Sequence, residues 1–324
     1  MKKSIMFILF ISLLIITGCT EKETTTETDH IKVGIMLSDA GLGDQSFSDL
    51  GFQGLEKARD ELNISFDYRE IADTKTYAKG IEELVKTDND LIIGLGFSIQ
   101  KDLETIAKKY PKKSFLLVDA QSDLPNVYTV TFKEEEASFL LGAIAGMKTT
   151  SNVVGFVGGD DVPLIQKFEK GFAAGVKSEN PEATVLSTYA GDFGNDKLGE
   201  NIAKEMIASK ADFIYPAAGF TGVGVINETQ RSGIYSFGVD SDQFYLAEKA
   251  VVSSMLKQVD VAIFNTIQQL VETGEISEKN QVLGIKENGV SIAPIRVLKL
   301  SPAETNRLEK LQEDIAGGSI TILK

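Results

Sequence analysis

The feature that most constrains the fold is a regular alternation of two kinds of segment between residues 31 and 240. Short apolar, β-branched runs such as IKVGIML (31–37) alternate with longer amphipathic runs such as SFSDLGFQGLEKARDEL (46–62). The short runs predict buried strands, and the longer runs predict helices with one apolar face. Strands that alternate with helices of this length predict βαβ units, and therefore a parallel sheet covered by helices.

The alternation runs through the chain twice. In the first round we expect strands at 31–37, 64–71, 91–96, 114–120 and 126–132, with helices at 46–62, 75–87 and 99–109. A long helix is expected at 134–148. The second round predicts strands at 152–159, 184–191, 212–219 and 234–240, with helices at 163–178, 195–209 and 222–231. The sequence therefore predicts an α/β protein with two Rossmann-like lobes in series.

Acidic residues follow several of the predicted strands. They are Asp39, Asp119, Asp192 and Asp240. In open parallel α/β sheets the ligand crevice lies outside the carboxyl ends of the strands. Any one of these aspartates can instead cap a helix or close a turn. Their recurrence in both rounds favours a polar cleft between the two lobes.

The N-terminus has the features of an export signal. Two lysines precede an apolar run at 5–16, which is shorter than the 20 or so residues that span a bilayer. The run ends in ITGC, which resembles the bacterial lipobox. We therefore interpret residues 1–18 as a lipoprotein signal peptide and Cys19 as the lipidated residue, on the extracytoplasmic face of the cell membrane. An ordinary secretory signal or an N-terminal anchor helix is the alternative.

Residues 19–30 form a polar stretch with no apolar periodicity, which we interpret as a tether. The chain has one cysteine and one histidine, His30. With Cys19 lipidated and His30 at the end of the tether, we expect no disulfide, metal site or Ser-His-Asp triad. Lys and Arg total 33 against 47 Asp and Glu, a net charge of −14. That charge argues against a nucleic-acid-binding surface.

Five longer stretches carry a resemblance to a known family. They are DAGLGDQSFSDLGFQGL, LPNVYTVTFKEEEASFLLGAIAGMKT, VGFVGGDDVPLIQKFEKGFAAGVK, YPAAGFTGVGVI and GVDSDQFYLAEKAVVSSMLKQVDVAI. From about residue 31 to 275 the chain resembles the basic membrane protein (BMP) family, the substrate-binding lipoproteins of ABC importers. Characterised members of that family are purine nucleoside receptors. The resemblance implies a monomer without cofactor, a nucleoside ligand and an ABC permease as partner.

The resemblance also implies a type I periplasmic-binding-protein fold, with two lobes, a hinge and a central cleft. We expect crossovers near residues 132–133, 240 and 257–258. The N-terminal lobe would then comprise 31–132 with about 241–257. The C-terminal lobe would comprise 133–240 with about 258–324.

The family's ligand contacts, transferred by motif, imply a set of site residues in this chain. They are Asp39, Phe47, Asp119, Phe193, Gly219, Asp240 and Lys257. Secondary candidates are Asp44, Ser46, Phe172, Phe220 and Asp242. Structural alternatives are Phe47 as a core residue, Lys257 as a surface partner of Asp260, and Asp242 as the cap of the following turn. We expect the acids of KEEE (133–136) to form the first turn of a helix.

Such a set suits a nucleoside. Aromatic rings stack on a flat base, and carboxylates accept hydrogen bonds from ribose hydroxyls and base N–H groups. A site rich in acceptors and poor in arginine favours nucleosides over nucleotides. Two other classes remain open: a lipid-tethered regulatory or sensor protein on the same fold, and a nucleoside-processing hydrolase that uses the carboxylates for acid–base work.

Overall fold

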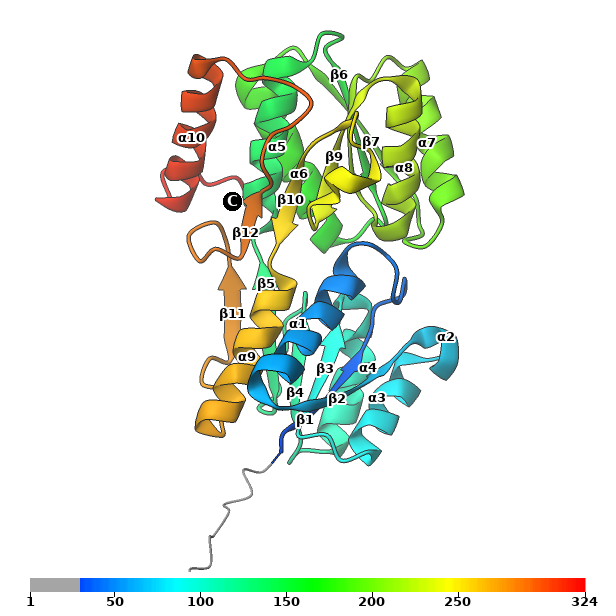
Figure 1. Ribbon diagram of the computed structural model, residues 1–324, viewed down its shortest axis with the longest axis vertical. Coiled ribbons are helices and arrows are strands. Elements are labelled where there is room, and N and C mark those ends of the chain that lie inside the picture. Colours follow the sequence, from blue (N-terminus) through cyan, green and yellow to red (C-terminus); the bar gives the residue numbers. More distant parts are fainter. Residues whose placement is uncertain (1–29, 324) are drawn as a thin grey trace, which may run out of the picture. The chain divides into compact units, whose positions relative to one another are not determined.

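The computed structural model describes residues 30–323, so the predicted signal peptide, Cys19 and most of the predicted tether lie outside the described residues. Residues 31–323 are built on two six-stranded sheets (Figure 1). The first sheet has the order β11 (Asn280–Leu283), β5 (Val127–Phe132), β4 (Ser114–Val118), β3 (Leu91–Leu95), β1 (Lys32–Met36) and β2 (Ser65–Arg69). All of its strands are parallel.

The second sheet has the order β12 (Val290–Ile292), β10 (Val251–Lys257), β9 (Tyr235–Asp240), β8 (Phe213–Ala217), β6 (Val153–Gly158) and β7 (Thr184–Tyr189). It is parallel except for β12, which pairs antiparallel with β10. The prediction of two α/β lobes is therefore confirmed. The elements expected between residues 31 and 240 are all present, within a few residues of their predicted ends.

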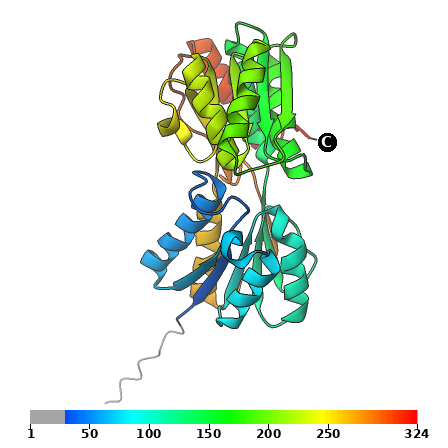
Figure 2. The same cartoon turned by 90° about the vertical axis from the view of Figure 1, so that its right-hand side faces the viewer.

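Helices cover both faces of each sheet, because successive side chains of a strand point to opposite faces. On β1, Val33 and Ile35 pack with α1 (Phe47–Leu62) and α9 (Val259–Thr273). Met36 packs on the other face with α3 (Tyr77–Lys86) and α4 (Gln100–Lys109). Figure 2 shows α1, in blue, and these two helices, in cyan, on different sides of the first sheet. A short helix, α2 (Ile71–Thr74), precedes α3.

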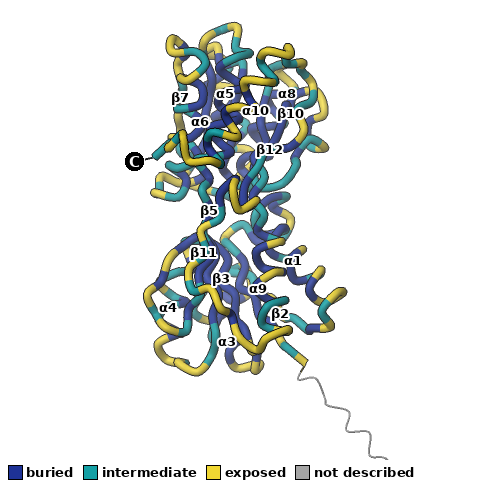
Figure 3. The backbone as a smooth tube through the Cα atoms, turned by 90° about the vertical axis from the view of Figure 1, so that its left-hand side faces the viewer, coloured by how far each residue is buried: buried dark blue, intermediate teal, exposed yellow. Residues whose placement is uncertain are grey.

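The second sheet is covered in the same way. The helices α5 (Glu134–Lys148) and α6 (Pro163–Glu179) pack on one face, and α7 (Asp196–Ala208) and α8 (Gly219–Ser232) on the other. The last helix, α10 (Pro302–Ala316), packs against α5. Figure 3 shows that the central strands of both sheets, such as β3 and β8, are buried. The edge strands β2, β7 and β11 are partly exposed. No helix among residues 30–323 is long and apolar enough to cross a membrane.

The chain passes three times between the two sheets, and this differs from the predicted lobes. It crosses after β5, returns after β10 so that α9 packs against α1, and crosses again between β11 and β12. The first lobe is thus 31–132 with 258–283, and the second lobe is 133–257 with 284–323. The predicted assignments of 241–257 and of 258–283 are wrong, and so is the crossover expected near residue 240.

Physical contacts explain both corrections. β10 pairs in parallel with β9, so the chain between them stays in the second sheet. Helix α9 returns to the first lobe and packs closely on α1, where a methyl group at Gly54 would come within 2.7 Å of the Asp260 carbonyl oxygen. Only a residue without a side chain lets the two helix backbones approach so closely.

The helices α5 and α6 approach each other in the same way, with glycine on both sides of the contact. A methyl group at Gly142 would lie 2.0 Å from the Phe172 carbonyl oxygen, and one at Gly175 would lie 2.0 Å from that of Phe139. The two backbones are therefore in direct contact. This contact fixes the relative position of the first turns of the two helices, which carry several residues of the site described below.

We predict that Gly175→Ala lowers the free energy of unfolding by roughly 3 kcal/mol, the upper end of the usual cost of overpacking, because a backbone oxygen cannot move aside. Thermal or chemical unfolding of residues 30–324 measures this. Gly194→Ala is the matched control, since a methyl group there has only the Asp192 carboxylate nearby, at 3.6 Å. Equal stability of the two variants would contradict a backbone-to-backbone contact.

Candidate ligand-binding site

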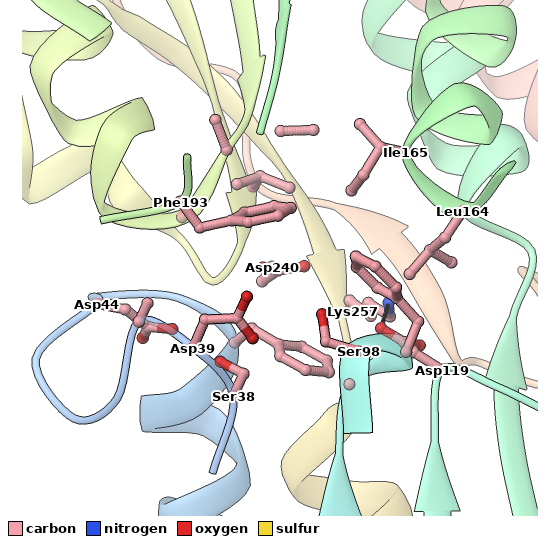
Figure 4. Close-up of a pocket in the computed structure, with 18 of the residues that line it drawn as sticks. Ser38, Asp39, Asp44, Ser98, Asp119, Leu164, Ile165, Phe193, Asp240 and Lys257 are labelled. Atoms are coloured by element: carbon pink, nitrogen blue, oxygen red, sulfur yellow. Dashed lines mark hydrogen bonds and ion pairs between the residues drawn. The ribbon is translucent and has the colours of Figure 1, made fainter. Parts of the chain in front are cut away.

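A cavity lies at the carboxyl ends of strands from both sheets. It encloses about 650 Å³ of space free of protein atoms, part of it open to solvent. Eight predicted residues line it: Asp39, Asp44, Phe47, Asp119, Phe193, Gly219, Asp240 and Lys257. Figure 4 shows Asp39, Asp119, Asp240 and Phe193 around one space, with Lys257 beside Asp119.

The other four candidates lie outside the lining of this cavity. Ser46 is buried and donates its hydroxyl to Asp240 Oδ2 at 2.5 Å. Phe172 is a core residue whose ring packs 5.3 Å from that of Tyr215. Phe220 is the second residue of α8. Asp242 pairs with Arg296 at 2.8 Å and accepts a hydrogen bond from the Phe244 amide, so it caps a short 3-10 helix (Gln243–Leu246).

Two of the lining acids share an unusual backbone conformation. Asp119 directly follows β4 and Asp240 is the last residue of β9, and both have positive φ, +67° and +62°. Aspartate tolerates the left-handed region better than most residues. The chain thus turns sharply at the end of each strand, one from each sheet, and the carboxylate remains at the strand end beside the cavity.

Asp39 and Asp44 have different surroundings. The carboxylate of Asp44 accepts backbone N–H groups of Ser46, Ser48 and Asp49 at 2.8–3.2 Å, so it caps the start of α1. Burial raises the pKa of Asp44 to about 6, although these hydrogen bonds oppose the shift. Asp39 is exposed at the rim and accepts a hydrogen bond from the Tyr77 hydroxyl. Of the two, Asp39 is the freer to meet a ligand.

Lys257 is buried, with only 2% of its side chain exposed, so the alternative of a surface pair with Asp260 does not hold. Its ammonium donates to Asp119 Oδ2 at 2.5 Å and lies 3.0 Å from Glu134 Oε1, outside hydrogen-bond geometry. Three phenylalanine rings surround it, with centroids 5.0–5.7 Å away: those of Phe47, Phe132 and Phe168.

The charges around Lys257 decide its protonation. Burial lowers the pKa of Lys257, but the charges of Asp119, Glu134 and Asp240 outweigh burial and raise it, so the ammonium stays charged. Burial raises the pKa of Asp119 to about 6, against the opposing effect of Lys257. The second carboxylate oxygen of Asp119, Oδ1, is buried and has no hydrogen-bond partner among the described residues. It is an acceptor that a bound molecule can satisfy.

Several residues of the site were missed by sequence reasoning. Glu134 was expected in the first turn of a helix, where it does lie, but nothing in KEEE distinguishes it from the two glutamates that follow. Phe97 lies just past β3, so the rule that found the aspartates applies to it as well. Its ring lies 6.3 Å from that of Phe193, which comes from the second lobe. Phe168, Leu164 and Ile165 on α6 complete the apolar lining.

Hydrogen bonds join the two lobes beside the cavity. The Gln45 carbonyl oxygen, in the loop before α1, accepts from Ser241 Oγ at 3.2 Å and from Gln243 Nε2 at 3.0 Å. Gln45 itself has a positive φ of +56°. Together with the bond from Ser46 to Asp240, these contacts hold the loop of the first lobe against the second lobe.

The arrangement supplies rings, acceptors and one buried cation. Four phenylalanines and four aspartates line the cavity, with Lys257 as the cation among the lining residues. Within residues 30–323 no three His, Cys, Asp or Glu side chains are arranged to hold a metal ion. The cavity is therefore suited to a flat, partly apolar molecule with several hydrogen-bond donors.

Comparison with known proteins identifies the group to which the chain is related. The family model described as "ABC transporter substrate-binding protein PnrA-like" (Bmp) matches residues 31–323. An uncharacterized lipoprotein of Pyrococcus abyssi is 33% identical, over 89% of this chain and 75% of that protein. The ABC transporter nucleoside-binding protein BmpA of Lactococcus lactis is 28% identical, over 96% and 95%.

Among solved structures, an ABC transporter solute-binding protein of Aeropyrum pernix superposes with a TM-score of 0.83 at 26% identity, over 90% of this chain and 92% of that one. This likeness agrees with the type I periplasmic-binding-protein fold. Family, fold and cavity lead to one conclusion: the chain belongs to the Bmp family of PnrA-like ABC transporter substrate-binding proteins.

Proposed function

We propose that this substrate-binding protein captures a nucleoside, with a preference for purines, and delivers it to the permease of an ABC importer. The observation that carries the proposal is the composition of the cavity. Aromatic rings from both lobes and one unpaired carboxylate oxygen, Asp119 Oδ1, line the same space. The relative from Lactococcus lactis that bears the name nucleoside-binding protein supports the same ligand class.

The rings suit the base. Phe193 belongs to the second lobe, and Phe47 and Phe97 belong to the first, so a base between the lobes meets rings from both sides. Stacking of a base on an aromatic side chain contributes about 1–3 kcal/mol. The two fused rings of a purine offer more surface for stacking than the single ring of a pyrimidine, which is the basis of the proposed preference.

The acids suit the ribose. Its vicinal hydroxyls are donors, and a hydrogen bond to a carboxylate contributes about 1.5–3 kcal/mol. Asp119 Oδ1 is an unpaired acceptor at the cavity. Because the cavity has four aspartates and Lys257 as the cation among its lining residues, the phosphate of a nucleotide would meet net repulsion. The acids act in recognition rather than in catalysis, so we expect no turnover of the ligand.

We predict that inosine and guanosine bind residues 30–324, and that Asp240→Asn weakens inosine binding by about tenfold, since about 1.4 kcal/mol of a charged hydrogen bond is lost. Calorimetry measures the affinity. Asp242→Asn is the matched control, because Asp242 lies two residues away but pairs with Arg296 outside the cavity.

Two results would contradict this proposal. One is equal weakening by the two variants, which would remove Asp240 from the site. The other is release of hypoxanthine from inosine during incubation with the protein, which would favour the hydrolase alternative. Failure of every nucleoside to bind, with a thermal shift from some other solute, would overturn the ligand class and leave the family assignment intact.

We predict that inosine affinity is constant above about pH 7 and falls by up to about tenfold per pH unit below about pH 6. The carboxyl pKa of Asp119 is raised to about 6 in the ligand-free protein, mainly by burial. Its unfolded value is near 3.8, so the folded protein takes up the proton at higher pH, and the acceptor is lost as pH falls through 6. Calorimetry between about pH 5 and 7.5 tests this.

For the pH experiment, Asp119→Asn is the informative variant. It should bind inosine more weakly at neutral pH and show a flatter profile, because its amide does not titrate. An affinity that rises on acidification would mean that the protonated carboxyl donates to the ligand, contrary to the proposed role.

We also propose that Cys19 carries a diacylglycerol that anchors the protein outside the cytoplasm, as the names of related lipoproteins suggest. Two acyl chains give stable attachment. We predict that Cys19→Ala moves the protein from the membrane fraction to the soluble fraction and leaves inosine affinity unchanged. Retention of the variant on membranes after high-salt and carbonate washes would indicate an anchor helix instead.

A further inference from the structure

A line of alternating charges runs beneath the cavity, and only its first members touch the ligand space. Asp119 and Lys257 line the cavity, but Glu134 does not. Glu134 is fully buried, with Oε1 3.0 Å from the Lys257 ammonium and Oε2 3.0 Å from the Lys167 ammonium. Lys167 also donates to the Phe132 carbonyl oxygen at 3.0 Å. The order is therefore acid, base, acid, base.

Two members of this line, Glu134 and Lys257, lie at points where the chain changes lobe. Asp119 ends a strand of the first sheet, and Lys257 is the last residue before the chain returns from the second lobe to the first. Glu134 begins α5, directly after the first crossover, and Lys167 lies on α6 of the second lobe. The ion pair between Glu134 and Lys257 thus links the first crossover to the second.

We infer that Glu134 is a positioning residue for ligand binding: without touching the ligand, it holds the Lys257 ammonium between itself and Asp119. This inference rests on the proposed function, because the ligand is the one proposed above. It extends the site to a residue outside the cavity and assigns a reason for a fully buried glutamate at the start of a helix.

The surroundings of Lys257 explain why a second acid is needed. Three phenylalanine rings surround the ammonium and only 2% of the Lys257 side chain is exposed, so the acids supply its polar partners. With Glu134 present, the ammonium is shared between two carboxylates. Without it, the ammonium has Asp119 as its nearest carboxylate. Since a buried charge interacts strongly with its nearest partner, the ion pair between Lys257 and Asp119 would become stronger. Asp119 would then be a weaker acceptor for the ligand.

Lys167 supports Glu134 from the opposite side. About one third of the Lys167 side chain is exposed, so its loss disturbs the core less than loss of Glu134. If Glu134 acts by positioning Lys257, removal of Lys167 should also weaken ligand binding, but less strongly. Glu135, the next residue along α5, has no ion pair with Lys257 or Lys167 within 4.0 Å and serves as the matched control.

A double-mutant cycle on residues 30–324 tests the inference, with inosine as the probe and calorimetry as the measurement. We expect Glu134→Gln to weaken binding about tenfold, the size of effect of losing one charged partner. In a Lys257→Met background the same change should have less than about a twofold effect, because interacting residues are non-additive. Glu135→Gln should have no effect in either background. Equal weakening by Glu134→Gln in both backgrounds would overturn the inference.

Lys167→Met provides a second route that leaves the buried glutamate in place. We expect it to weaken inosine binding about threefold with Lys257 present and not at all with Lys257→Met, again by non-additivity of interacting residues. An effect of equal size in both backgrounds would contradict the inference, whether or not Glu134→Gln yields a folded protein.

A readout in the ligand-free protein separates this inference from the proposed function. Heteronuclear NMR of lysine side chains, with the Lys257 signal assigned from Lys257→Met, should show that signal displaced in Glu134→Gln and unchanged in Glu135→Gln. An unchanged signal in Glu134→Gln would overturn the inference. Wild-type protein that binds no nucleoside would overturn the proposed function alone, since the NMR comparison needs no ligand.

Discussion

The buried ammonium of Lys257 is the interaction on which the rest of the site depends. Carboxylates that lose their water are unstable unless a positive charge lies close to them. Asp119, Glu134 and Asp240 all raise the pKa of this one lysine, and they come from three different parts of the fold. The lysine therefore makes it possible for acids from both lobes to face a single cavity.

Two devices of the backbone bring those groups together. Asp119, just after β4, and Asp240, at the end of β9, both adopt the left-handed conformation. Each sheet therefore places a carboxylate at the carboxyl end of one of its strands. Glycines between α5 and α6 let two helices touch along their backbones, which sets Glu134 on one helix opposite Lys167 on the other. Both features of the backbone fix the distances between the groups that line the cavity.

Local pattern was enough to predict the elements up to residue 240, because strand and helix periodicity is a property of neighbouring residues. Acids such as Asp119 and Asp240 could be found for the same reason, since they directly follow apolar runs. The family resemblance added Lys257, whose neighbourhood alone suggested a surface pair. The pairing of β10 with β9 and the return of α9 to α1 depend on contacts between distant residues, and the predicted lobes were wrong at these points.

Glu134 escaped prediction for a related reason. Its ion-pair partners, Lys257 and Lys167, are distant in sequence, and two further glutamates follow it directly in the chain. Phe97, just past an expected strand, and Phe168, on an expected helix, were missed because an apolar residue in an apolar pattern carries no sign of whether it faces core or cavity.

The three passages between the lobes have a consequence for how the protein folds. β5 pairs with β11, whose residues lie about 150 positions further along the chain, as in the bond between Thr129 and Asn280. The first lobe is therefore incomplete until nearly the whole second lobe has been synthesised. Contacts of such long sequence separation are costly in loop entropy and form slowly. Residues 31–132 alone lack both α9 and an edge strand, so a nascent chain of that length exposes apolar surface that only its later segments can cover.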